Sequence, residues 1–118
     1  MKLNHLALTV TDVPATSNFL EKYFSLKPRP VAAGNINMAL MDDDNGSIIS
    51  LFKGEKVQYP ESFHIGFIQD NEARVDEIHA RFKADGFEAN EPQRLHGTYT
   101  FYFKSPAGFT IEVLSVLN

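Results

Sequence analysis

The chain has 118 residues, about one domain, and its 43% hydrophobic and 22% charged residues are ordinary for a folded globular protein. Its formal net charge of −4, without a basic run, argues against nucleic acid as a partner. The absence of cysteine excludes disulfides, thiolate metal sites and a cysteine nucleophile. No apolar stretch approaches the roughly 18 residues of a membrane span, and the first residues are too polar for a secretory signal, so we expect a cytoplasmic protein without membrane contact.

The first half of the chain begins with a predicted strand and helix. Apolar and polar residues alternate over residues 4–11, which predicts a strand with one face in the core and the other free to line a cavity. Asp12 is placed to cap the helix that follows, and Pro14 suits its first turn. The helix carries an apolar stripe of Phe19, Leu20, Tyr23 and Phe24. Pro28 and Pro30 prevent it from continuing.

Two further strands are predicted in the first half, over residues 36–41 and 47–53. They are joined by the turn at residues 42–46, whose Asn-Gly pair tolerates positive φ and is typical of a hairpin. Residues 53–60 are polar and rich in turn formers. We interpret them as a linker.

The second half repeats the order of elements. A strand-like run opens at His64, and a helix follows that Asp70 or Asn71 can cap and Gly86 can end. Its apolar face is formed by Val75, Ile78 and Phe82. The remaining predicted strands cover residues 87–90, 99–104 and 109–116.

The two halves resemble each other in their polar residues as well. Each first strand opens with a histidine, His5 or His64, and is closed by an aspartate, while Ser50 and Glu112 occupy matching places in the last strands. The sequence therefore predicts one α+β domain of two tandem βαβββ modules. These modules are expected to cover about residues 1–54 and 62–118.

His5, His64 and Glu112 are the candidate metal ligands. Because side chains alternate along strands, two histidines at equivalent strand starts can point into one concave surface if the modules pack about a pseudo-twofold axis. Two imidazoles and a carboxylate are a common ligand set for divalent metals and leave positions open for substrate. The alternative is that both histidines are hydrogen-bonded structural residues and that Glu112 lies on the solvent face of an edge strand.

Several motifs resemble the vicinal oxygen chelate superfamily, which includes glyoxalase I, extradiol dioxygenases, fosfomycin-resistance enzymes and bleomycin-resistance proteins. They are His5-x-Ala7-Leu8-x-Val10-x-Asp12, the helical segment Phe19–Leu26, the strand opening with His64, and Ser105-Pro106-x-Gly108-x-x-x-Glu112. The resemblance implies a cup-shaped mixed sheet with helices outside, usually completed in a homodimer. It also implies one divalent metal per site, Fe, Zn, Mn, Ni or Co, held by His5, His64 and Glu112.

Departures from the family patterns reduce the number of reactions expected of this chain. Glyoxalase I has a fourth, carboxylate ligand where this chain has Ser50, and fosfomycin thiol transferases have a lysine where it has Pro92, so both activities are disfavoured. Extradiol dioxygenases have a similar histidine and tyrosine before the last ligand. That resemblance makes His96 a candidate acid/base and Tyr102 a candidate substrate donor, against solvated-loop and packing roles respectively.

We therefore expect a metal-dependent, lyase-like or dioxygenase-like enzyme that acts on a small oxygen-rich substrate. The alternative is a metal-independent protein of the bleomycin-resistance type that binds a drug in the same cleft, and a third possibility is a metal-free domain with structural histidines. Arg94 could bind an anionic substrate, although a lone loop arginine is usually solvated. The expected substrate-binding residues are Thr9, Ser50, Arg94, Tyr99 and Thr100.

Overall fold

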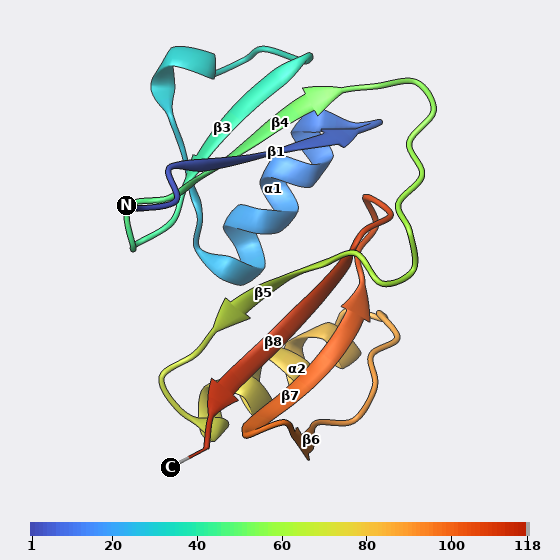
Figure 1. Ribbon diagram of the computed structural model, residues 1–118. Helices are drawn as coiled ribbons and strands as arrows, with labels where there is room; N and C mark the ends of the chain where they lie inside the picture. The colour runs from blue at the N-terminus through green and yellow to red at the C-terminus, as the bar shows by residue number, and fades with distance from the viewer. Residues whose placement is uncertain (118) are drawn as a thin grey trace. The chain divides into compact units, whose positions relative to one another are not determined.

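The computed structural model describes residues 1–117 and divides into two compact units, Met1–Gln58 and Tyr59–Asn118. Each unit consists of one α-helix and one four-stranded mixed sheet in the order βαβββ (Figure 1). The predicted α+β fold of two tandem βαβββ modules is confirmed. Within residues 1–117, neither helix is long and apolar enough to cross a membrane.

Unit 1 forms the sheet β1-β4-β3-β2, in which β1 runs parallel to β4 and the other pairs are antiparallel. The helix α1 packs on β3 and β4. The elements are β1 (His5–Val10), α1 (Val13–Phe24), β2 (Lys27–Pro28), a 3-10 turn η1 (Pro30–Ala32), β3 (Met38–Asp42) and β4 (Ile48–Lys53).

The start and the buried face of α1 are as predicted. Asp12 is the N-cap, and its side chain accepts a hydrogen bond of 3.0 Å from the backbone N–H of Ala15, while Pro14 lies in the first turn. Leu20 and Tyr23 are buried. The cap therefore satisfies a free N–H at the helix start, and the apolar stripe anchors the helix on the sheet.

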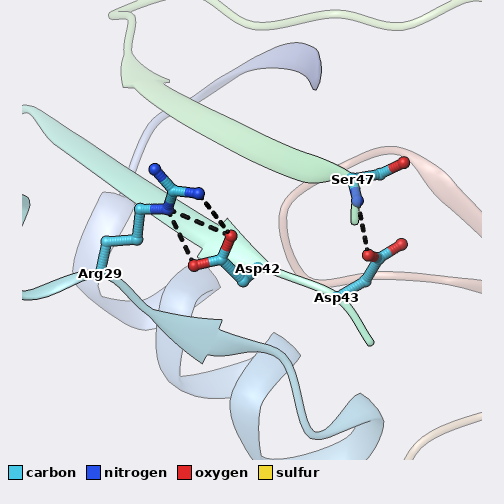
Figure 2. A network of polar contacts seen from close by, with 4 residues as sticks. All are labelled: Arg29, Asp42, Asp43 and Ser47. Carbon is cyan, nitrogen blue, oxygen red and sulfur yellow. Dashed lines mark hydrogen bonds and ion pairs between the residues drawn. The ribbon is translucent and has the colours of Figure 1, made fainter. Parts of the chain in front are cut away.

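The β3–β4 hairpin is closed by the predicted turn, in which the side chain of Asp43 accepts a hydrogen bond from the backbone N–H of Ser47 (Figure 2). The Oδ1 atom of Asp43 accepts hydrogen bonds from the backbone N–H groups of Asn45 and Ser47, at 2.9 and 2.8 Å. Gly46 adopts φ 81°, where a side chain is disfavoured. These contacts fix the register in which β4 returns along β3.

A surface ion pair joins the ends of β2 and β3. Arg29 donates from Nε and Nη2 to both carboxylate oxygens of Asp42, at 2.9 to 3.1 Å (Figure 2). The hydrogen bonds from Arg29 hold the pKa of Asp42 below its usual range. The pair therefore holds the short strand β2, which the sequence did not indicate, against β3.

Unit 2 repeats the topology as the sheet β5-β8-β7-β6, with β5 parallel to β8. The helix α2 packs on β7 and β8. The elements are β5 (His64–Ile68), α2 (Glu72–Ala84), β6 (Gln93–Leu95), β7 (Thr98–Lys104) and β8 (Thr110–Val116).

The core of unit 2 forms between α2 and the sheet. Asn71, one of the two predicted caps, accepts a hydrogen bond of 2.9 Å from the backbone N–H of Arg74. The predicted apolar face of the helix is buried, and the Phe82 ring stacks on Phe103 at 4.3 Å between centroids. This packing occupies one face of the sheet and leaves the other face open to carry polar groups.

The predicted strand at residues 87–90 is wrong. Phe87 instead completes the end of α2, because its backbone N–H bonds to the carbonyl of Phe82 at 2.9 Å and its ring packs on Phe103. Gly86, with φ 87°, makes this left-handed closure possible. The short strand lies later, at Gln93–Leu95, and returns into β7 through a tight turn.

Candidate metal centre

The open face of the unit 2 sheet carries Glu112 at its centre. The strand register places Glu112 of β8 between Gly66 of β5 and Tyr102 of β7. Two residues before Glu112 on β8, Thr110 lies beside His64 of β5. Because directly paired residues share a face, the imidazole, the carboxylate and the phenol all lie on the side opposite α2.

Glu112 is held by two neighbours. Its Oε2 atom accepts a hydrogen bond of 2.7 Å from the hydroxyl of Thr100, and its Oε1 atom lies 3.4 Å from Nε2 of His64. Thr100 is only 2% exposed and the Glu112 side chain 15%. A carboxylate in such surroundings needs partners for its charge, and one oxygen is turned toward the imidazole.

The imidazole of His64 is oriented from its other nitrogen. Nδ1 donates to the backbone carbonyl of Ser62 at 3.0 Å, an assignment that follows from the carbonyl being an acceptor only. Nε2 is then left to face Glu112. This arrangement, one ring nitrogen hydrogen-bonded to a carbonyl and the other directed at a ligand position, is typical of metal-binding histidines.

Tyr102 borders the same pair of side chains. Its ring meets the His64 ring edge to face at 5.6 Å between centroids. Burial and the neighbouring Glu112 carboxylate raise the pKa of Tyr102 above its ordinary value. The phenol therefore stays protonated near neutral pH and can donate a hydrogen bond.

Unit 1 has the same geometry without the carboxylate. Ser50 lies between Ala7 of β1 and Leu40 of β3, the register positions that Gly66 and Tyr102 occupy around Glu112. The serine is 5% exposed. His5 repeats the pattern of His64, because its Nδ1 donates to the side-chain oxygen of Asn4 at 2.8 Å and leaves Nε2 for another partner.

The donor set of unit 2 fits two positions around one divalent ion. Ligand atoms about 2.1 Å from a tetrahedral ion lie about 3.4 Å apart, which is the separation of His64 Nε2 and Glu112 Oε1. A Cβ atom at Gly66 would lie 3.3 Å from the Leu114 side chain, so the glycine allows β5 to approach β8 closely at this point. Over residues 1–117, no three His, Asp or Glu side chains gather as a complete ligand group. His5 belongs to unit 1, so neither unit alone contains the predicted trio.

Two predicted substrate residues lie on the other face of the unit 2 sheet. The hydroxyl of Tyr99 donates to Asp76 of α2 at 2.6 Å, a hydrogen bond that, with burial and the carboxylate charge, raises the pKa of Tyr99 to about 12. Arg94 pairs with Glu72 of α2 at 2.6 Å and lies over the Tyr99 ring. Both side chains are engaged with the helix rather than with Glu112.

His96 and Thr9 are also separate from the unit 2 cluster. His96 forms the tight turn between β6 and β7 with φ 52°. It precedes Tyr102 by six residues, which corresponds to roughly 20 Å along an extended strand. Thr9 lies on β1 in unit 1, where its methyl group packs against the backbone of Gly54. Of the predicted catalytic and substrate residues, the structure brings Tyr102 and Thr100 to Glu112.

Sequence reasoning missed the residues that support the ligands. The Ser62 carbonyl leaves no signal in the sequence, because every residue has one. Gly66 did leave a signal, since a glycine inside an apolar strand often marks a close approach, and its close neighbour here is the Leu114 side chain.

Comparison with known proteins identifies the family of the chain. Residues 2–113 match the Glyoxalase/Bleomycin resistance protein/Dioxygenase superfamily. A possible glyoxalase from Bacillus cereus is 48% identical, with a TM-score of 0.88 over 97% of this chain and 98% of that one. The fosfomycin resistance protein FosX from Listeria monocytogenes is 26% identical, with a TM-score of 0.77 over 98% of this chain and 93% of that one.

Lactoylglutathione lyase from Agrobacterium tumefaciens shares the fold at 22% identity, with a TM-score of 0.75 over 97% of this chain and 92% of that one. A comparison with curated proteins found no match. The family match extends over both units, including the strands that carry His5, His64 and Glu112. The chain belongs to the Glyoxalase/Bleomycin resistance protein/Dioxygenase superfamily.

Proposed function

We propose that the protein is a divalent-metal-dependent enzyme that acts on a small oxygen-rich substrate. The metal ligands are His64 and Glu112 of unit 2 and His5 of unit 1. The observation that carries this proposal is the pair His64 Nε2 and Glu112 Oε1, 3.4 Å apart, with the imidazole oriented by the Ser62 carbonyl. Members of the superfamily commonly use such a metal, which supports the assignment.

The bound metal supplies a Lewis acid that polarises neighbouring oxygens of the substrate. The residues around it provide orientation and one proton donor. Thr100 holds the Glu112 carboxylate through Oε2, and Tyr102 donates from its protonated phenol to a substrate oxygen.

The geometry favours a lyase-like reaction over a dioxygenase-like one. The dioxygenase interpretation requires His96 as acid/base, and that histidine lies in the β6–β7 turn, six residues before Tyr102 of β7. Ser50 at the position equivalent to Glu112 also departs from the four-ligand centre of glyoxalase I. A metal-dependent, lyase-like reaction with three protein ligands remains as the proposal.

We further propose that the protein acts as a homodimer, which membership of the superfamily supports. His5 then reaches the metal from the same chain or from a second copy. A mixed dimer that regains metal binding although neither copy carries both His5 and Glu112 would identify the second arrangement. Mixing His5→Ala chains with Glu112→Gln chains tests this, because one complete site returns per mixed dimer.

Metal analysis of protein purified without chelator tests the proposed function. We expect close to one equivalent of divalent metal per chain, and a loss of at least tenfold in affinity for His64→Ala and for Glu112→Gln. His96→Ala is the matched control, because it removes an exposed histidine from the same unit, and it should bind as the parent does. Equal metal binding by all four proteins would refute this ligand assignment. Absence of bound metal together with tight binding of a drug by metal-free protein would favour the bleomycin-resistance type instead.

A further inference from the structure

Lys104 is an exposed cation on the open face of the unit 2 sheet. The register pairs Lys104 with Thr110, which in turn pairs with His64, so the three residues form one row across β7, β8 and β5. With strands about 4.8 Å apart, Lys104 and His64 start about 10 Å from each other. Among residues 1–117, no ion pair or side-chain hydrogen bond engages the ammonium group of Lys104.

A hollow of about 870 Å³ adjoins this lysine. Its walls include Tyr102, Lys104 and Thr110 from the open side of the sheet, and Asn90 from the segment after α2. The hollow therefore reaches from the tyrosine that borders Glu112 to the unpaired ammonium group. A molecule at His64 and Glu112 would have to pass Tyr102 to enter this hollow and reach Lys104.

Arg94, the cation that the sequence analysis suggested for an anionic substrate, already forms an ion pair. Arg94 is paired with Glu72 at 2.6 Å and lies against the helix side of the sheet. One carboxylate, Glu88, also lines the hollow, and it opposes the binding of an anion there. Lys104 thus lies on the same face of the unit 2 sheet as His64 and Glu112, and Glu88 limits how strongly it attracts negative charge.

We propose that Lys104 is a specificity-determining residue that binds an anionic group of the substrate, a carboxylate or a phosphonate, while vicinal oxygens at the other end of the same molecule bind at His64 and Glu112. The binding of the vicinal oxygens at His64 and Glu112 rests on the proposed function. An ammonium group recognises either anion as a point charge, and the two sources are separated by the choice of probe.

The test uses three hydroxamates, each with the same pair of neighbouring oxygens, titrated calorimetrically into metal-loaded protein. Acetohydroxamate is neutral at its far end, succinic monohydroxamate carries a carboxylate, and phosphonoacetohydroxamate carries a phosphonate. We expect at least one of the anionic probes to bind about tenfold tighter than acetohydroxamate, and Lys104→Met to remove that preference. The preferred probe shows whether the anionic group of the substrate is a carboxylate or a phosphonate.

Three variants sharpen the result. Lys104→Arg should retain most of the preference, Glu88→Gln should increase it, and Arg94→Met, which removes a cation from the other face, should leave it unchanged. A wild-type protein that binds all three probes equally, or a preference that survives in Lys104→Met, overturns the proposal.

A second readout does not depend on metal. Inorganic phosphate titrated into metal-free protein should shift the backbone amide NMR signals of residues 102–105 and 107–110, and Lys104→Met should abolish these shifts. If the protein binds no metal but shows the shifts, the proposed function fails and the anion site stands. If metal and hydroxamates bind but charge makes no difference and phosphate causes no shifts, the anion site fails alone.

Discussion

Thr100→Val tests whether the carboxylate of Glu112 is positioned by its hydrogen bond. Valine keeps the shape and the strand preference of threonine and removes only the hydroxyl that donates to Glu112 Oε2 at 2.7 Å. A hydrogen bond to a charged acceptor contributes about 1.5–3 kcal/mol. Since the Glu112 side chain is 15% exposed and water can replace part of the bond, we expect unfolding of the metal-free protein to become easier by about 1.5 kcal/mol.

The same substitution should weaken metal binding. Removing a residue that orients a metal ligand typically costs 10–100-fold in affinity, or about 1.4–2.7 kcal/mol. Urea denaturation of metal-free protein measures the first effect, and competition with a chelator of known affinity measures the second. Thr110→Val is the matched control, because Thr110 lies on the same face and strand as Glu112, whereas the hydroxyl that donates to the carboxylate is that of Thr100.

The reasoning is refuted if Thr100→Val and Thr110→Val lose equal stability and equal metal affinity. A loss of stability without a loss of metal affinity would also contradict it, because the hydrogen bond would then serve only the fold.

Three further predictions concern groups outside the metal site. Asp76→Asn should lower the pKa of Tyr99 from about 12 toward 10.0, because the aspartate favours the neutral phenol; tyrosinate absorbance measures this pKa. In the parent, the Tyr99–Asp76 hydrogen bond should stabilise the fold below pH 10, and this stabilisation should be lost as the pH rises toward 12. The stability difference between the parent and Arg29→Met should be present above pH 3.8 and vanish in acid denaturation series as the pH falls and Asp42, whose folded pKa is lowered, becomes protonated. His79→Leu should raise the free energy of unfolding in urea by about 1 kcal/mol, because the buried Nε2 atom of His79 finds no hydrogen-bond partner among residues 1–117. An unchanged or lower value would show that this nitrogen is satisfied in solution.

The predicted elements that match the structure depend on local chemistry. The cap at Asp12 and the closure at Gly86 involve residues within one turn of the helix ends, so the sequence alone indicates them. The strand at Gln93–Leu95 depends on pairing with β7, and the sequence placed it too early. Phe87 misled the prediction because its apolar side chain serves the helix end instead of a strand.

The candidate site was predictable in its ligands and less so in its surroundings. The repeat in the sequence pointed to His64 and Glu112, and the parallel pairing of β5 with β8 brings them to 3.4 Å. Tyr99 and Thr100 could not both face a substrate, because neighbouring residues in a strand point to opposite sides. The structure places Thr100 beside Glu112 and Tyr99 against α2.

The most direct test of the central claim is an X-ray absorption spectrum of the metal in protein loaded with one equivalent. The account predicts outer-shell scattering from two imidazoles in the parent protein. It predicts one imidazole in His5→Ala and one in His64→Ala, with the spectrum of His96→Ala unchanged. A parent spectrum without imidazole scattering, or a His64→Ala spectrum identical to that of the parent, would contradict the assignment of the metal centre.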